Sequence, residues 1–384
     1  MTSSFGRGAS IVAALWLAAC GASAPEAAQV RASKVEAAGY RESEVVFLKK
    51  PRPAELYLAT GRGYTVKQQA DGTFPDTVDG PKGPLAVESL RRAYFIVAAG
   101  LLAEGQEADR LLDQGLKAFE WGFQQAGDQG SFPNERGGTT KKQNSLHPKA
   151  VYIEAAARTL LLLQQSDVDA TTRRRIEALI PALHKSARWM AESQDTVIYF
   201  KRNRNTNQLM VVATGLQETA IVTGDQALAA KAQALMEEVL ARQTDDGAFP
   251  EKGGFDSGYQ GVSLELLGRY FATLKPSPWR ARVEAALRKG TDRLVTAIDP
   301  ATGQINDSAN TRTVACGAPV DEDDPKAKPV LRSSLRIHYL GHLLNDEARL
   351  SPLAERVSEQ GQVFTHDDKC PAEKRALAGD KGGE

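Results

Sequence analysis

The sequence of 384 residues has few cysteines, few aromatic side chains and no excess of either charge. Its three cysteines form no CxxC pair and show no spacing typical of a cysteine-based metal site. We expect no metal site and no cofactor, and a need for Ca²⁺ stays open. Lysine and arginine number 48, as do aspartate and glutamate, and this balance excludes bulk electrostatic capture of nucleic acid. Any anion that the protein binds must be held by locally placed charges.

Long apolar runs are also scarce, and the run SIVAALWLAAC at 10–20 is too short to span a bilayer. It follows Arg7, an arrangement typical of an export signal. Its last residues, Leu-Ala-Ala-Cys, resemble the bacterial lipoprotein box, in which the cysteine is lipidated after cleavage. We therefore expect a signal peptide over 1–19, a tether over 20–45 and a lipid on Cys20 that holds the protein in the cell envelope, at the outer membrane. An ordinary secretory signal with an incidental cysteine is the alternative.

Two cysteines remain once Cys20 is assigned to the lipid. Cys316 and Cys370 lie on opposite sides of the last expected helix pair, and an oxidising compartment leads us to expect a disulfide between them. Two buried or free thiols are the alternative. Residues 46–365 are expected to form one domain, followed by a polar tail at 366–384.

Apolar residues recur at i, i+3, i+4 and i+7 through most of this domain, and this period predicts helices. Gly224 followed by Asp225 marks a sharp corner, since glycine ends helices and aspartate caps them. Strand signals are scarce, VIYF at 197–200 being the best, so the expected fold class is all-α. We place helices at about 86–104, 106–125, 148–165, 170–193, 208–223, 226–243, 259–274, 277–297, 331–346 and 350–360, with an earlier piece near 53–69.

A Gly-x-Phe-Pro phrase recurs between these helices. The copies are DGTFP at 71–75, QGSFP at 129–133 and DGAFP at 246–250, with a degenerate TGQI at 302–305. Another copy is missing near Gln194. Helix pairs repeated with one turn chemistry predict an (α/α) toroid of about five to six hairpins. The phenylalanine of each copy is expected in the core, between neighbouring hairpins.

Alternate helices of such a toroid form an inner ring, and their N-termini converge at one mouth of the central cavity. The inner helices are expected to begin near Leu85, His147, Asn207, Gly258 and Leu331. Free N–H groups and positive dipole ends at helix starts favour an anion such as a carboxylate. This mouth is therefore where we expect a functional site.

Four segments bring polar side chains to the mouth, and each side chain also has an ordinary structural interpretation. Asp256 can cap the helix that follows it, Tyr259 can pack in the core, and the arginines can be solvated charges. His338 and His342 lie four apart on one helix, but without the HExxH pattern we expect no metal there. The candidates are Glu251, Asp256 and Tyr259 in the first segment, Arg202, Arg204 and Asn207 in the second, His147 in the third, and Arg332 and Arg336 in the fourth.

The turns that follow glutamine-ended helices, together with DGAFPEKGGFDSGYQGVSLELL at 246–267, resemble the (α/α) toroid domains of polysaccharide lyases. In that family, Asn, His, Tyr and Arg of the inner helices are catalytic groups, and Asn207, His147, Tyr259 and Arg204 could match them. The tandem Asn-Asn-His-x-Tyr of the family is missing here. Terpene-cyclase toroids share the turn, but the acidic stretch at 320–328 lies among Pro and Lys and is typical of a solvated loop.

The resemblance implies β-elimination on an acidic, uronic-acid-containing polysaccharide. Asn or Arg neutralises the carboxylate, His or Tyr removes the C5 proton, and Tyr protonates the departing oxygen. A non-catalytic glycan-binding or scaffold lipoprotein stays open, as does a glycoside hydrolase that uses Glu251 with Asp256 or Glu88. We expect Tyr259, His147 and Asn207 to be catalytic, and Arg202, Arg204, Asp256, Glu251, Arg332 and Arg336 to bind substrate.

Overall fold

The computed structural model describes residues 40–75, 77, 86–132, 146–192, 205–251, 254–305 and 329–359. Every regular element in these ranges is a helix, so the predicted all-α fold class is confirmed. In chain order they are η1 (Arg41–Val45, a π-helix), α3 (Val46–Leu48), α4 (Pro51–Thr65), η2 (Val87–Arg92, a 3-10 helix), α5 (Ala93–Gly100), α6 (Gly105–Gln124), α7 (Leu146–Gln164), α8 (Ala170–Glu192), α10 (Thr206–Thr223), α11 (Gln226–Ala241), α12 (Ser257–Ala272), α13 (Pro278–Val295), α14 (Pro329–Leu343) and α15 (Glu347–Glu359).

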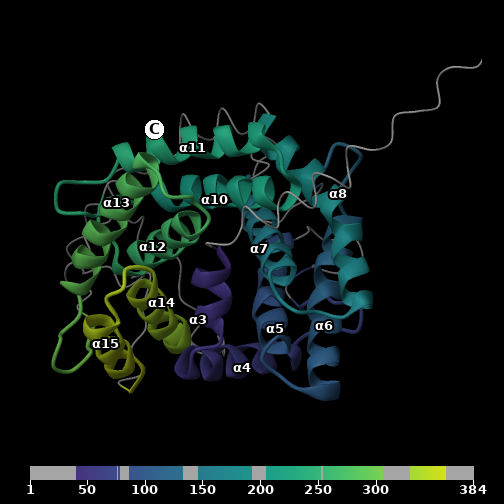
Figure 1. Ribbon diagram of the computed structural model, residues 1–384, viewed down its shortest axis with the longest axis horizontal. Coiled ribbons are helices and arrows are strands. Elements are labelled where there is room, and N and C mark those ends of the chain that lie inside the picture. Colours follow the sequence, from purple (N-terminus) through teal and green to yellow (C-terminus); the bar gives the residue numbers. More distant parts are fainter. Residues whose placement is uncertain are drawn as a thin grey trace, which may run out of the picture.

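The helices form a two-layered ring (Figure 1). An inner layer of α5, α7, α10, α12 and α14 is wrapped by α6, α8, α11, α13 and α15, and α4 packs between α5 and α14 to close the circle. Each inner helix and the outer helix after it make a hairpin. Among the described residues there are thus five such pairs besides α4, which confirms the predicted (α/α) toroid of five to six hairpins.

Burial follows the two layers. All residues of α7 except His147 and Gln164 are buried, because neighbours surround the helix on nearly every side. On the outer helix α6 the buried residues, from Leu111 to Phe123, recur at helical spacing and leave a polar face in the solvent. One apolar core therefore runs around the ring, between its two layers.

Each repeated turn leads from the end of one helix into the next inner helix, and its glycine has a left-handed backbone. The φ angles are +93° at Gly72, +77° at Gly130, +94° at Gly247 and +76° at Gly303. A Cβ on Gly72 would lie 2.6 Å from a backbone carbon of Lys117, so the turn also packs directly on a helix. The phenylalanines Phe74, Phe132 and Phe249 are buried, as predicted.

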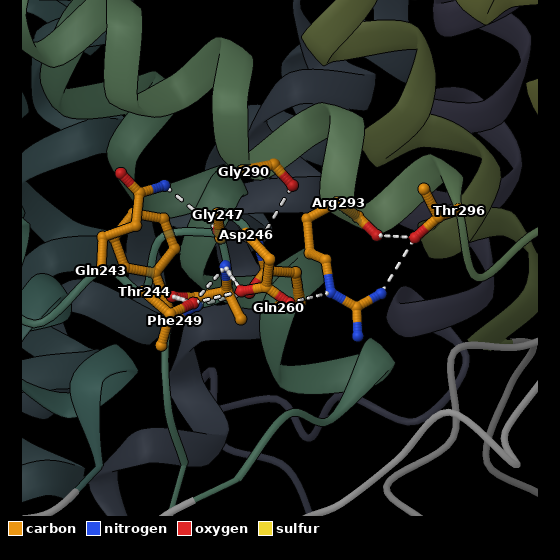
Figure 2. A network of polar contacts seen from close by, with 10 residues as sticks. Gln243, Thr244, Asp246, Gly247, Phe249, Gln260, Gly290, Arg293 and Thr296 are labelled. Atoms are coloured by element: carbon orange, nitrogen blue, oxygen red, sulfur yellow. Dashed lines mark hydrogen bonds and ion pairs between the residues drawn. The ribbon is translucent and has the colours of Figure 1, made fainter.

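Figure 2 shows how side-chain amides hold one of these turns. Gln243, just after α11, donates from Nε2 to the Gly247 carbonyl at 3.1 Å. It also donates to the Ala286 carbonyl at 2.9 Å. Gln260, on α12, accepts the Phe249 N–H at 2.9 Å and donates to the Gly290 carbonyl at 3.0 Å. Gln68 repeats the first arrangement with Gly72 and Gln114. The turn therefore fixes where each inner helix begins.

The N-terminal segment formed by η1 and α3 lies inside the ring (Figure 1). Phe47 of α3 is buried against the rings of Tyr57, Tyr339 and His342. Within the described residues, no helix has both the length and the apolar character needed to cross a membrane. The expected strand at 197–200 lies outside the described residues.

Candidate functional site

A cavity of about 350 Å³ lies inside the ring, lined mainly by the inner helices. Its volume is at the lower end of the range of small-molecule sites, about 300–1,000 Å³. His147, Asn207 and Tyr259 all contribute to the lining. They occupy the first turns of α7, α10 and α12, three inner helices that are neighbours in the ring. The structure thus brings together the three side chains that the sequence predicts to be catalytic, at the predicted mouth.

The start of α12 is set by a side-chain cap. Asp256 is buried, and its Oδ1 accepts the backbone N–H of Tyr259 at 2.9 Å. This cap satisfies a free N–H at the helix start and fixes the backbone from which the Tyr259 side chain projects. Asp256 is not among the residues that line the cavity. Its structural interpretation, a helix cap, therefore holds, and a substrate-binding role stays a prediction.

The start of α10 is capped from a distant part of the chain. The N-cap residue Asn205 makes no side-chain cap. Instead, Oε1 of the buried Glu251 accepts the Asn207 N–H at 2.8 Å, and Thr206 donates its hydroxyl to the Pro250 carbonyl at 2.6 Å. Glu251 does not line the cavity. The carboxylate predicted to bind substrate thus holds Asn207 in place, and direct binding by Glu251 stays a prediction.

Two polar atoms of this group have no hydrogen-bond partner in the described part of the chain. They are Oδ1 of Asn207 and Nδ1 of His147, both shielded from solvent. Burial, aided by the charge of Arg91, lowers the pKa of His147 to about 4. Desolvation disfavours the charged imidazole. His147 is therefore neutral at pH 7 and is able to accept a proton or a hydrogen bond.

Deeper in the cavity lies an ionic cluster that sequence reasoning missed. Arg336, a predicted binding residue, donates from Nε to Glu265 at 2.7 Å, and Arg269 pairs with both Glu265 and Glu154. Burial alone would raise the pKa of Glu265, but the charges of Arg269 and then Arg336 and Arg158 outweigh it and hold the pKa well below its usual range. The carboxylates of the cluster are thus neutralised by arginines.

The sequence does carry a signal for this cluster. Glu154 and Arg158, like Glu265 and Arg269, are four residues apart in helices that are almost entirely buried. Such spacing puts both charges on one helix face. A charged stripe on an inner helix is an anomaly, because apolar surroundings penalise unpaired charge. It could have located the deep half of the cavity.

Other ionisable groups extend the cluster below the cavity. Arg158 stacks on Tyr94, with Cζ 3.5 Å from the ring centroid, and lies 3.8 Å from Oε2 of Glu44 in η1. Glu218 of α10 is fully buried, and neither carboxylate oxygen has a hydrogen-bond partner among the described residues. Burial and, secondly, the charge of Glu154 raise the pKa of Glu218 well above its usual range.

The remaining predicted residues fall outside this geometry. The side chains of Arg202, Arg204, Arg332, Cys20, Cys316 and Cys370 lie outside the described residues. His338 and His342 contact Glu355 and Glu347, at 3.1 and 3.3 Å. In the ranges that the structure describes, no three His, Cys, Asp or Glu residues converge as a metal site.

As a whole, the cavity lining mixes polar and apolar side chains in about equal measure and is slightly basic. Four arginines face three glutamates in it. At its mouth a neutral imidazole, an amide and a phenol come together next to the positive ends of three helices. This set of groups is able to bind a carboxylate and to move a proton beside it.

Comparisons with known proteins support the fold. No family model and no curated protein sequence matches the chain. Among solved structures, the Streptomyces coelicolor A3 chondroitin AC lyase in complex with chondroitin sulphate superimposes with a TM-score of 0.54 at 14% identity, over 92% of this chain and 49% of that one. A tyrosine-to-alanine mutant of the same lyase gives a TM-score of 0.52 at 15% identity, over 88% and 50%. The chain therefore has the helical fold of these lyases and spans about half their length.

Proposed function

We propose that the protein is an exported lyase that cleaves a uronic-acid-containing polysaccharide by β-elimination. The observation that carries this proposal is that His147, Asn207 and Tyr259, from three neighbouring inner helices, line one cavity. The helical fold shared with chondroitin AC lyases supports it, and one of those structures is in complex with chondroitin sulphate, an acidic polysaccharide. By this analogy we propose an acidic polysaccharide as the substrate.

In the proposed reaction a base removes the C5 proton of the uronate. The C–H electrons form the C4–C5 double bond, the C4–O bond breaks, and the departing oxygen takes up a proton. Neutral His147 suits the base, because its pKa of about 4 leaves its ring nitrogen unprotonated at pH 7. The Tyr259 hydroxyl suits the acid that protonates the leaving oxygen.

Stabilising the carboxylate matters as much as moving the proton, because negative charge spreads onto it in the transition state. Asn207 suits this task, since it lies in the first turn of α10 and lines the cavity. The exposed Arg91, in the last turn of η2 just before α5, adds positive charge at the mouth. Helix N-termini contribute further N–H groups.

We extend the proposal to the location of the protein. The run at 10–20 and the cysteine at its end favour a lipoprotein held in the cell envelope by Cys20, at the outer membrane. A polysaccharide substrate fits that compartment. Mass spectrometry of the membrane-bound form tests this part, because lipidation of Cys20 adds acyl chains and removes residues 1–19.

The lyase is tested with the mature, unlipidated protein and a panel of uronate polysaccharides, including chondroitin sulphate. Ultraviolet absorbance from new unsaturated uronate ends is the readout. Tyr259→Phe removes only the hydroxyl and is expected to abolish the signal. Tyr64→Phe, a buried tyrosine outside the cavity lining, is the matched control and should keep it. Absence of signal from the wild-type protein on every polymer would contradict the proposal.

A glycoside hydrolase fits the cavity less well. That reaction needs one protonated carboxylic acid beside the glycosidic oxygen. Two of the three lining glutamates, Glu154 and Glu265, are each paired with Arg269, and the pKa of Glu265 is lowered rather than raised. The third, Glu88, lines the cavity, but its predicted partner Glu251 does not. Release of reducing ends without ultraviolet absorbance would favour the hydrolase, and binding without either product would favour the glycan-binding lipoprotein.

A further inference from the structure

The cavity extends well below the proposed reacting groups. On α7 its lining runs from His147 through Ala155 to Arg158, about 16 Å of helix at 1.5 Å per residue. On α12 it runs from Tyr259 to Arg269, a similar length. The groups proposed for catalysis thus lie at the mouth, and most of the cavity lies below them.

The cavity ends where the N-terminal segment enters the ring. Glu44 of η1 is buried, receives a hydrogen bond from the Tyr339 hydroxyl and lies 3.8 Å from Arg158. Both Tyr339 and Arg158 are lining residues, so Glu44 lies directly behind the cavity wall. Val45, Phe47 and Leu48 of the same segment are buried as well, whereas Val46 is 48% exposed on its other side.

Solvent does not reach the groups behind this floor. Tyr40, at the start of the segment, is 1% exposed, and Glu218, which faces the same cluster from α10, is 0% exposed. Figure 1 shows α3 within the ring, where it occupies the central opening. In the described part of the chain, the cavity is therefore a blind pocket with one mouth rather than a channel through the toroid.

The deep part of the pocket is lined by two arginines whose Nε–H donors are unpaired within the described structure. Arg158 and Arg269 line it, both are more than nine-tenths buried, and the Nε–H of each has no acceptor among the described residues. Buried donors without acceptors are costly, so they indicate a ligand with acceptor oxygens. Sugar hydroxyl, ring and carboxylate oxygens are such acceptors.

We infer that the polysaccharide enters this pocket end-on, so that the protein recognises chain ends and cleaves short fragments from them. The inference rests on the proposed lyase function and specifies its mode of action. A chain that lay across the mouth would reach His147, Asn207 and Tyr259 but would leave the deep donors without acceptors. A chain end that occupies the pocket brings acceptor oxygens to these arginines and places the bond to be cleaved at the mouth.

The first test is the size distribution of products from the best polymer of the panel. End-on cleavage releases short fragments of uniform size from the earliest times, while the viscosity of the remaining polymer falls slowly. A ladder of intermediate lengths with a rapid loss of viscosity would overturn the inference and leave the lyase function standing. No product from any polymer would instead count against the lyase itself.

The second test needs no catalysis. Equal masses of chondroitin sulphate, one intact and one partly depolymerised, are titrated with Tyr259→Phe protein. End recognition predicts that the protein bound per gram rises in proportion to the number of chain ends. Equal capacity for both samples would overturn the inference. The same pair of samples, intact and partly depolymerised, is prepared from each of the other panel polymers. If the protein binds none of these samples, both the end-on inference and the proposed function are overturned.

A third test blocks the pocket without touching its mouth. Ala155 lies on α7 about 12 Å of helix below His147, and Ala155→Phe fills the pocket there. End-on binding predicts about tenfold or greater loss of kcat/KM and of affinity. Leu266→Phe, on α12, is a second block in case the first variant fails to fold. Ala281→Phe, exposed on the outer helix α13, is the control, and unchanged activity in folded blocked variants would overturn the inference.

Discussion

Glu251 accepts the backbone N–H of Asn207 at 2.8 Å, although 44 positions separate the two residues. The contact joins the turn before α12 to the first turn of α10. It replaces the local side-chain cap that Asn205 does not provide. A residue of the proposed catalytic group is therefore positioned by a neighbouring repeat, which couples the stability of α10 to the geometry of the mouth.

Glu251→Ala is expected to destabilise the protein by about 1–2 kcal/mol, because a helix N-terminus loses its cap. It should also lower kcat more than it raises KM, since Asn207 is no longer held where charge develops. Urea unfolding and steady-state kinetics measure the two effects.

Ser277→Ala is the matched control for that substitution. Ser277 caps the outer helix α13 by accepting the Arg280 N–H at 3.1 Å. Its loss should cost about 1 kcal/mol and leave kcat unchanged. Equal kinetic effects in the two variants would mean that general destabilisation, rather than the position of Asn207, lowers the rate.

Local patterns predicted the helices well, because their signals are local. Gly224 has φ +76° and Asp225 caps α11 through the N–H groups of Ala227 and Leu228, as the Gly-Asp pair predicted. The main difference between the predicted and observed helices concerns the first inner helix, which was expected at about 86–104. It begins as the 3-10 helix η2 at Val87, and its α-helical part ends at Gly100 rather than near 104.

The mouth of the cavity was predictable for the same reason, since repeat spacing locates the helix starts that carry His147, Asn207 and Tyr259. Apart from Arg336 the deep cluster was not predicted, because most of its ion pairs join distant residues, even though the Glu265–Arg269 pair is local. Arg158 and Glu265 lie on different helices and meet at 3.8 Å only after the ring closes. Likewise, no local pattern distinguishes a capping carboxylate such as Glu251 from a substrate-binding one.

His147 makes the activity and the stability depend on pH in different ranges. Its pKa in the folded protein is about 4, below its value of 6.5 in an unfolded chain. The acid limb of kcat/KM should therefore lie near pH 4 rather than near 6.5, because kcat/KM reports the free enzyme. An acid limb near 6.5 would contradict the assigned environment of His147.

The sign of the stability effect follows from proton binding. Between pH 6.5 and 4 the unfolded chain binds the His147 proton and the folded protein does not, so stability falls as the pH drops through this window. The full loss is about 3 kcal/mol, at 1.36 kcal/mol per pKa unit. In His147→Gln, the free energy of unfolding measured with urea should no longer show this fall between pH 6.5 and 4. The same pH dependence in the variant and the wild type would mean that His147 does not cause it.

Gly247 is expected to tolerate no side chain. Gly247→Ala imposes a Cβ at φ +94° that overlaps the carbonyl of Lys289, and we expect a loss of about 2–5 kcal/mol. Gly224→Ala is the control, because Gly224 has φ +76° but open space where a Cβ would lie. It should cost only about 1–2 kcal/mol. Thermal unfolding measures both losses. If the two variants lose similar stability, α13 moves aside to make room for the new Cβ, and the turn does not fix the position of the next inner helix.

Glu218 gives the opposite pH dependence from His147. Its folded pKa is raised by burial first and then by Glu154, so the protonated form is the one that the fold stabilises. Its contribution is fully present below the unfolded value, 4.5, and is lost as the pH rises through the folded pKa. Glu218→Gln, which cannot ionise, should therefore match the wild type at pH 4.5 and exceed it increasingly at higher pH.

Urea midpoints at several pH values measure this difference, with Glu177→Gln on the exposed face of α8 as the control that should follow the wild type. A Glu218→Gln variant that is less stable than the wild type at pH 8 would show that the carboxylate is ionised and paired with Arg269 or Arg158. The deep cluster would then carry one more negative charge than the described contacts indicate. A deep cluster with this extra negative charge would repel the end of an acidic chain. This measurement therefore also bears on how the substrate lies in the pocket.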